Sequence, residues 1–250
     1  RRLEDQVRLL SLRAESSPGG LATIRGELEE LRDVEESNKQ LERRIEELLI
    51  TIQELQARLS QLDELDPLER YLTQSAISRK IALERLRAAI KTDFPDLDVV
   101  ISQENDAIRF KGEGLFETNV STLTIEKRAI VIRIAEILDD ILPCYTIGPR
   151  AAFDMECNPG FGVIEAVQIE GHTDSVGSNS YNMRLGSDRA LSTYAAMVEH
   201  IPILTDHRNA DLEPVISIAG YGEDRPVASN LSVEGRSTNR RIDMRFIMYT

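Results

Sequence analysis

An acidic and a basic residue stand close together in the sequence and could form a binding site for charged groups. Asp174 follows an apolar run over 162–169 that predicts a buried strand, and glycines on either side of it predict a loop. Arg189 lies in 181–200, where apolar residues recur at every third or fourth position, as in a helix. The two side chains therefore come from separate elements and can face one pocket.

Both residues also have ordinary structural explanations. Asp174 could cap the following helix or stabilise its own loop. Arg189 could lie on the helix surface and pair with Asp188 or Glu223. The spacing alone leaves both explanations open.

An enzyme active site or a metal site is not indicated. His172 and Asp174 are close in sequence, but the chain has three histidines, and His200 and His207 fall at a helix end and in a loop. No cluster of Cys or carboxylate residues completes a zinc site, and no Ser has the surroundings of a nucleophile elbow. We therefore predict no enzyme activity, no metal and no cofactor.

The charge of the chain limits its partners. The formal net charge is -13 and the isoelectric point is about 4.8. An acidic surface repels phosphate backbones, so we expect no nucleic acid partner. No apolar run approaches the ~20 residues that cross a bilayer. Because the chain begins at Arg1 without Met, we interpret it as part of a longer or processed protein, with any signal peptide or membrane anchor upstream.

Cys144 and Cys157 flank a stretch that is rich in Pro and Gly and reads as an irregular loop over 143–161. A disulfide between them would stabilise the fold by roughly 3 kcal/mol and would indicate an oxidising compartment. Two unpaired thiols fit the sequence equally well. Neither cysteine has the spacing of a metal ligand.

A heptad pattern covers 21–65. Position a is occupied by Ile24, Leu31, Asn38, Ile45, Ile52 and Leu59, and position d by Glu27, Val34, Leu41, Leu48, Leu55 and Leu62. Ile at a with Leu at d favours a parallel two-stranded coiled coil, and a single Asn at a fixes register and oligomeric state. We therefore predict a homodimer. The alternative is one amphipathic helix packed on its own domain.

The remaining chain predicts an α+β domain. We divide the chain into an N-terminal segment (1–20), the coiled coil (21–65), a helical connector (66–95) and a globular domain (96–250). In this domain we expect strands at 97–101, 107–110, 162–169, 215–218 and 241–248. We expect helices at 124–142 and 181–200 and a long loop at 220–239. The order β-β-α-β-α-β-β predicts a sandwich of helices against a small mixed sheet.

Several spaced motifs resemble the OmpA-like peptidoglycan-binding domain family, over roughly 107–248. They are Phe116-Glu117-Thr118-Asn119, Ile169-Glu170-Gly171-His172-Thr173-Asp174 with Gly177, Asn182, Leu185, Arg189 and Ala190, and Gly220-Tyr221-Gly222-Glu223 with Pro226, Asn230, Glu234-Gly235-Arg236 and Asn239-Arg240-Arg241. Two departures stand out. Gly186 replaces the usual Ser and is expected to loosen the first helical turn, and the 143–161 loop is an insertion.

The resemblance implies a non-catalytic site for the peptide stem of peptidoglycan, held through meso-diaminopimelate. Asp174 would bind the ammonium and Arg189 the carboxylate of its zwitterionic end. A ligand lacking either charge would leave one group of the pocket unpaired. By motif match, the same site is lined by Asn119, Thr173, Asn182 and Arg240. His172 is expected to have a structural role.

Within this family the chain is most similar to the periplasmic part of a flagellar-type stator B subunit, the MotB-like group that includes a subunit of anti-phage Zorya systems. This likeness implies a periplasmic location, an inner-membrane tether upstream of Arg1 and an inner-membrane stator-type partner. The dimeric chain would anchor that complex to the cell wall. The alternative is a structural coiled-coil scaffold whose OmpA-like domain has lost its ligand.

Overall fold

The structure is a computed structural model that describes residues 5–9, 20–63, 66–110 and 115–249. It divides into two compact units, Arg1–Leu65 and Asp66–Thr250. The helical connector therefore belongs to the same unit as the α+β domain, and the two units are described separately.

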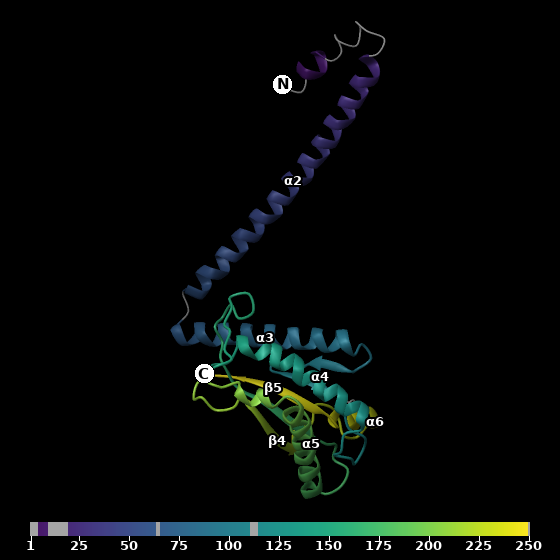
Figure 1. Ribbon diagram of the computed structural model, residues 1–250, viewed down its shortest axis with the longest axis vertical. Helices are drawn as coiled ribbons and strands as arrows, with labels where there is room; N and C mark the ends of the chain where they lie inside the picture. Colours follow the sequence, from purple (N-terminus) through teal and green to yellow (C-terminus); the bar gives the residue numbers. More distant parts are fainter. Residues whose placement is uncertain (1–4, 10–19, 64–65, 111–114, 250) are drawn as a thin grey trace. The chain divides into compact units, whose positions relative to one another are not determined.

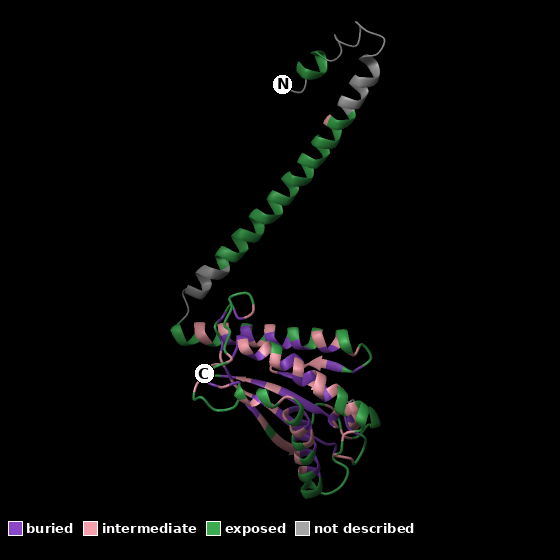
Figure 2. Cartoon of the chain, in the orientation of Figure 1, coloured by how far each residue is buried: buried purple, intermediate pink, exposed green. Residues whose placement is uncertain are grey.

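The first unit consists mainly of helix α2, Gly20–Asp63. Its sequence is rich in Glu, Leu, Arg and Gln, which are strong helix formers. The structure describes its side chains over 29–57, where the apolar heptad residues are about half exposed (Figure 2). They are Val34, Leu41, Ile45, Leu48, Ile52 and Leu55. The heptad residues Ile24, Glu27, Leu59 and Leu62 lie outside the described side chains. Among described helices, none combines the length and apolar character needed to cross a membrane.

The second unit is built on a mixed five-stranded sheet, which confirms the predicted fold class. The strands are β1 (Val99–Ile101), β2 (Ala107–Phe110), β3 (Ile164–His172), β4 (Ile216–Gly222) and β5 (Ile242–Met248), in the order β1-β2-β5-β3-β4. β3 pairs with β4 in parallel, and the other neighbours are antiparallel. Strand β3 therefore runs between β5, the central strand, and β4 at the edge of the sheet.

Helices α3 (Pro67–Asp93), α4 (Ile125–Ile141) and α5 (Asn179–His200) pack with this sheet (Figure 1). α5 contacts β3 and β4, while α4 lies between α3 and α5. Each helix begins at a polar residue whose side chain accepts a backbone N–H: Asp66, Thr124 and Ser178, respectively.

The segment 220–239, predicted as a loop, is different in the structure. β4 continues to Gly222, and a short helix, α6, spans Val233–Asn239. The Ser232 side chain caps α6 by accepting from the N–H of Gly235. A helix of seven residues is too short to show a periodic apolar pattern, so the prediction missed it.

The core lies between the sheet and the helices. The alternating residues of β5, Ile242, Met244, Phe246 and Met248, are all buried, as their spacing predicted. They meet apolar residues of β2, β3 and the helices, among them Ile108, Phe110, Val167, Ile169, Leu83, Leu86, Ile90, Ile134 and Leu138. This core fixes the position of β3, and thereby of the residues that follow it.

Two glycines bring α5 against the sheet. Gly171 was expected in a loop but lies in β3, where a Cβ would overlap the backbone of Gly186. A Cβ on Gly186 would lie 2.6 Å from the Gly171 carbonyl oxygen and 2.9 Å from the Gly222 nitrogen. The expectation that Gly186 loosens the helix is therefore wrong: α5 is continuous, and glycine is needed for close packing.

A disulfide joins Cys144 and Cys157, so the insertion over 143–161 is a closed loop. Asn158 is fully buried at its base and donates to the carbonyls of Cys144 and Gly162. The loop leads directly into β3. The sequence had left pairing and free thiols equally open.

Candidate functional site

Asp174 lies just beyond the end of β3, and local hydrogen bonds fix its side chain. The Val176 N–H donates to Asp174 Oδ1 at 2.9 Å. The Thr173 hydroxyl donates to the Asp174 carbonyl, and the Thr173 N–H donates to Gly222 on β4. The carboxylate is 11% exposed, so it borders solvent from a rigid turn.

Arg240 is the ion-pair partner of Asp174. Its Nη1 donates to Asp174 Oδ2 at 2.8 Å, and its side chain is 18% exposed. Arg240 follows α6 and precedes β5. The pair therefore joins the ends of β3 and α6, and each carboxylate oxygen of Asp174 accepts one hydrogen bond.

Arg189 is buried on α5 and binds backbone carbonyl groups. Nε donates to Val120 at 2.9 Å, Nη2 to Glu117 at 2.8 Å, and Nη1 to His172 at 3.4 Å. None of the described carboxylates lies within ion-pair distance. A guanidinium carries five N–H donors, and three of those of Arg189 bind carbonyls. Arg189 is therefore a buried cation that can donate further hydrogen bonds.

Charges of opposite sign act on Arg189 from nearby. Burial, and to a lesser extent the positive charge of Arg240, lower the pKa of Arg189 to about 10, although Asp174 opposes the shift. Arg189 and Arg240 also line one small pocket with Phe116 and Ile242. The guanidinium of Arg189 lies 5.6 Å from the centre of the Phe116 ring. The structure thus brings together Asp174, Arg189 and Arg240.

The two predicted asparagines occupy different environments. Asn119 is exposed and has a positive φ of 59°, which Asn tolerates better than most residues. It lies in the turn whose carbonyls bind Arg189. Asn182 is buried and donates to Glu223 at 2.5 Å. Its amide is therefore already engaged with Glu223, which the sequence suggested as a partner of Arg189 instead.

Comparison with known proteins identifies this part of the chain. Residues 162–240 match the model of the OmpA family. The chain contains an OmpA-family domain. The match includes Asp174, Asn182, Arg189 and Arg240 but not Asn119 or the disulfide loop.

Individual relatives cover limited parts of the chain. Outer membrane porin F of Pseudomonas aeruginosa is 41% identical over 30% of this chain and 19% of its own length. The peptidoglycan-associated lipoprotein of the same species is 33% identical over 38% of this chain and 51% of its own length. A MotB-like protein from Desulfovibrio vulgaris has a similar fold, with a TM-score of 0.50, 15% identity, and coverage of 71% of this chain and 96% of that protein.

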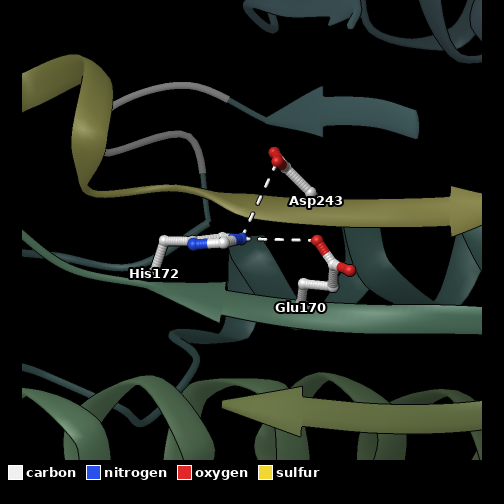
Figure 3. A group of neighbouring side chains, drawn as sticks. All are labelled: Glu170, His172 and Asp243. Atoms are coloured by element: carbon white, nitrogen blue, oxygen red, sulfur yellow. Dashed lines mark ion pairs between the residues drawn. The ribbon is translucent and has the colours of Figure 1, made fainter. Parts of the chain in front are cut away.

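The second unit also contains a buried cluster of charged residues that the sequence did not reveal, and one of them, Asp243, lies beyond the matched residues. Figure 3 shows Glu170 and His172 on β3 facing Asp243 on β5. His172 Nε2 lies 3.5 Å from Glu170 and 3.8 Å from Asp243. All three are at most 1% exposed. Such a set of oxygen and nitrogen atoms has the composition of a metal site.

Arginines already neutralise this cluster. Arg245 donates from Nε and Nη2 to the two oxygens of Glu170, at 2.7 and 3.1 Å. Asp243 receives hydrogen bonds from both Arg109 and Arg241. A divalent cation would add charge beside three guanidinium groups. We therefore assign the cluster to the structure of the OmpA-family domain, as ion pairs between neighbouring strands.

His172 completes the cluster as a neutral ring. Burial lowers its pKa, against the opposing effect of Glu170. The His172 ring stacks on the Tyr221 ring, with 5.4 Å between the ring centres. The guanidinium of Arg225 lies over the same Tyr221 ring, 3.6 Å from its centre. The position of His172 therefore matches the structural role expected for it.

Proposed function

We propose that this chain binds the peptide stem of peptidoglycan, without catalysis, through meso-diaminopimelate. The observation that carries the proposal is the buried guanidinium of Arg189, which has carbonyl partners but no carboxylate partner among the described residues. A carboxylate of the ligand would neutralise it. Membership of the OmpA family and similarity to a peptidoglycan-associated lipoprotein support this ligand class.

The free end of the stem carries an ammonium beside a carboxylate. Arg189 would donate its remaining N–H groups to the carboxylate in a charge-assisted, planar contact. Asp174 would accept from the ammonium. A carboxylate group has about four lone-pair positions, and two are used by Val176 and Arg240. The ammonium can therefore join Arg240 at Asp174 or replace it.

The other predicted residues would shape the site. Thr173 fixes the turn that presents Asp174. Asn119 belongs to the turn held by Arg189 and would position its amide at the edge of the site. Asn182 would act through Glu223, because its amide donates to that carboxylate. Arg240 would set the charge balance between Asp174 and Arg189.

We further propose that α2 joins two copies into a parallel coiled coil. Support comes from the exposed apolar heptad residues over 29–57 and from Asn38 within that stripe. A dimer in the periplasm, tethered to the inner membrane, would connect a stator-like complex to the cell wall. The alternative is a structural coiled-coil scaffold whose OmpA-family domain does not bind the wall.

Co-sedimentation with purified sacculi that contain diaminopimelate tests the proposed ligand. The wild-type chain should sediment, and Asp174→Asn should raise the apparent dissociation constant for sacculi at least about tenfold, because loss of one charged contact costs about 1.5–3 kcal/mol. Asp188→Asn is a matched control on the exposed face of α5. Undiminished sedimentation of a folded Asp174→Asn variant would refute the pocket, whereas a folded wild-type chain that does not sediment with sacculi would favour the scaffold.

A further inference from the structure

The two halves of α3 are attached to the OmpA-family unit in different ways. The C-terminal half buries Leu83, Leu86 and Ile90 completely in the core. In the N-terminal half the apolar residues Leu68 and Leu72 are largely exposed. The buried positions there are serines, and burial of a serine contributes little apolar contact. The N-terminal half is therefore held by few apolar contacts, together with a hydrogen bond from the Tyr71 hydroxyl to the Tyr249 carbonyl at 2.8 Å.

The base of the disulfide loop supplies a further attachment. Ser75 and Ser78 are the buried residues of the N-terminal half, and both hydroxyl groups lack a hydrogen-bond partner. A Cβ on Gly160 would overlap the Gln74 carbonyl, and a Cβ on Gly162 would lie 2.9 Å from the Ser78 Cβ. The loop backbone therefore lies directly against this half of α3, with no room for side chains between them.

The disulfide fixes the part of the loop that contacts α3. Cys157 precedes Asn158, whose side chain ties the carbonyls of Cys144 and Gly162 together. The hydroxyl of Tyr145 donates to the Cys157 carbonyl. A closed loop has far fewer open conformations than a free one. The disulfide thus limits how far Asn158, and the glycines that follow it, can move away from Cys144.

We infer that the Cys144–Cys157 disulfide is a redox-sensitive clasp that holds the N-terminal half of α3 on the domain. Cys144 is buried, whereas Cys157 is partly exposed. A dithiol reductant would attack the Cys157 sulfur and release Cys144 as a thiolate. Its second thiolate would then displace Cys157. Two electrons and two protons pass to the cysteines, and the reductant ends as a disulfide.

The clasp acts on the first turns of the second unit. α3 begins at Pro67, shortly after α2 ends at Asp63. Any tension along the chain from α2 therefore enters the domain through the first turns of α3. With the disulfide closed, these turns stay packed. With the disulfide open, they can separate, while Leu83, Leu86 and Ile90 keep the second half in place.

Hydrogen exchange of the full chain, measured by mass spectrometry with and without dithiothreitol, tests the clasp. Reduction should raise exchange in Tyr71–Lys80 by about 10- to 100-fold, since closing a loop of this size changes the opening equilibrium by about that factor. Peptides from β3, α5 and the second half of α3 should keep their protection. Alkylation must show that both cysteines were reduced.

Three variants separate the clasp from a general loss of stability. Cys144→Ser/Cys157→Ser should reproduce the reduced state without reductant. Gly160→Ala keeps the disulfide but forces the loop from Gln74, so it should also raise exchange in Tyr71–Lys80. Met155→Ala, in an exposed part of the loop, should not. Unchanged exchange in fully reduced protein, or an equal rise throughout the domain, would overturn the inference.

Discussion

Arg189 Nη2 lies 2.8 Å from the carbonyl oxygen of Glu117, so a side chain of α5 holds a turn that precedes α4. The residue proposed to bind the ligand carboxylate therefore also organises one wall of its own site. Loss of Arg189 would remove a ligand contact and displace Asn119 at the same time. Binding assays on Arg189 variants consequently need a stability measurement beside them.

Replacing Arg189 by Ala should destabilise the domain by about 2–4 kcal/mol, because the partly buried carbonyls of Val120 and Glu117 each lose a charged donor. Urea unfolding followed by circular dichroism would measure the change. Arg184→Ala, on an exposed position of the same helix, should change the unfolding free energy by less than about 0.5 kcal/mol. Equal stability of the two variants would contradict the role of Arg189 in the turn.

Gly186→Ala should destabilise the domain by about 1–3 kcal/mol, although Ala is the better helix former. The added Cβ would lie 2.6 Å from the Gly171 carbonyl oxygen and push α5 from β3. Thermal and urea unfolding would measure the effect. Leu191→Ala, at an exposed position of α5, serves as control. A stabilised Gly186→Ala protein would show that the close contact is not required.

Stability should fall as the pH is lowered below about 6.5. Burial lowers the pKa of His172, so the unfolded chain takes up a proton that the folded chain excludes. Burial disfavours charged Glu170, but His172 and Arg245 outweigh it and lower its pKa to about 2. Its stabilising contribution is therefore lost as the pH falls from about 4.5 towards 2.

Unfolding free energies measured from pH 7 to pH 3 would test this dependence. His172→Gln should flatten the decline between about pH 6.5 and 5. Part of the decline should persist, because burial also lowers the pKa of His207. His200→Gln, at the exposed end of α5, should leave the profile unchanged. An identical slope in His172→Gln would exclude His172 as a source.

Asn38→Ile should stabilise the α2 assembly and admit trimers or tetramers, because a buried Asn at position a specifies the dimer at a cost in stability. Light scattering and sedimentation equilibrium at micromolar concentration would report the oligomeric state. Gln40→Ile places the same side chain outside the a and d stripe and should leave a dimer. A monomeric wild-type chain would refute the predicted coiled coil.

Regular elements with long apolar patterns could be predicted from the sequence. β5 alternates over its full length, and α4 and α5 carry clear helical spacing. α6 could not, because its seven residues depend on one cap at Ser232. The role of Gly186 also escaped prediction, since its close approach to Gly171 is a contact between distant parts of the chain.

In the candidate site, too, some residues could be predicted from the sequence and others could not. Motifs indicated Asp174, Arg189 and Arg240, and the structure places them together. The acceptors of Arg189 are backbone carbonyls. Every residue has a backbone carbonyl, so the residue types do not indicate these contacts. The cluster of Glu170, His172 and Asp243 was hidden because Asp243 comes from another strand. Sequence patterns indicate residues that lie close together in the chain. These contacts join residues far apart in the chain, so they depend on the order of the strands in the sheet.

Strand β3 has the disulfide loop at one end and Asp174 at the other. Its nine residues span about 30 Å, and hydrogen bonds join it to β4 and β5 on both sides. A load between the two ends would act along the strand and shear many hydrogen bonds at once, rather than unzip them singly. The pairing of β3 on both sides thus favours resistance of the domain to a pulling force applied along this strand.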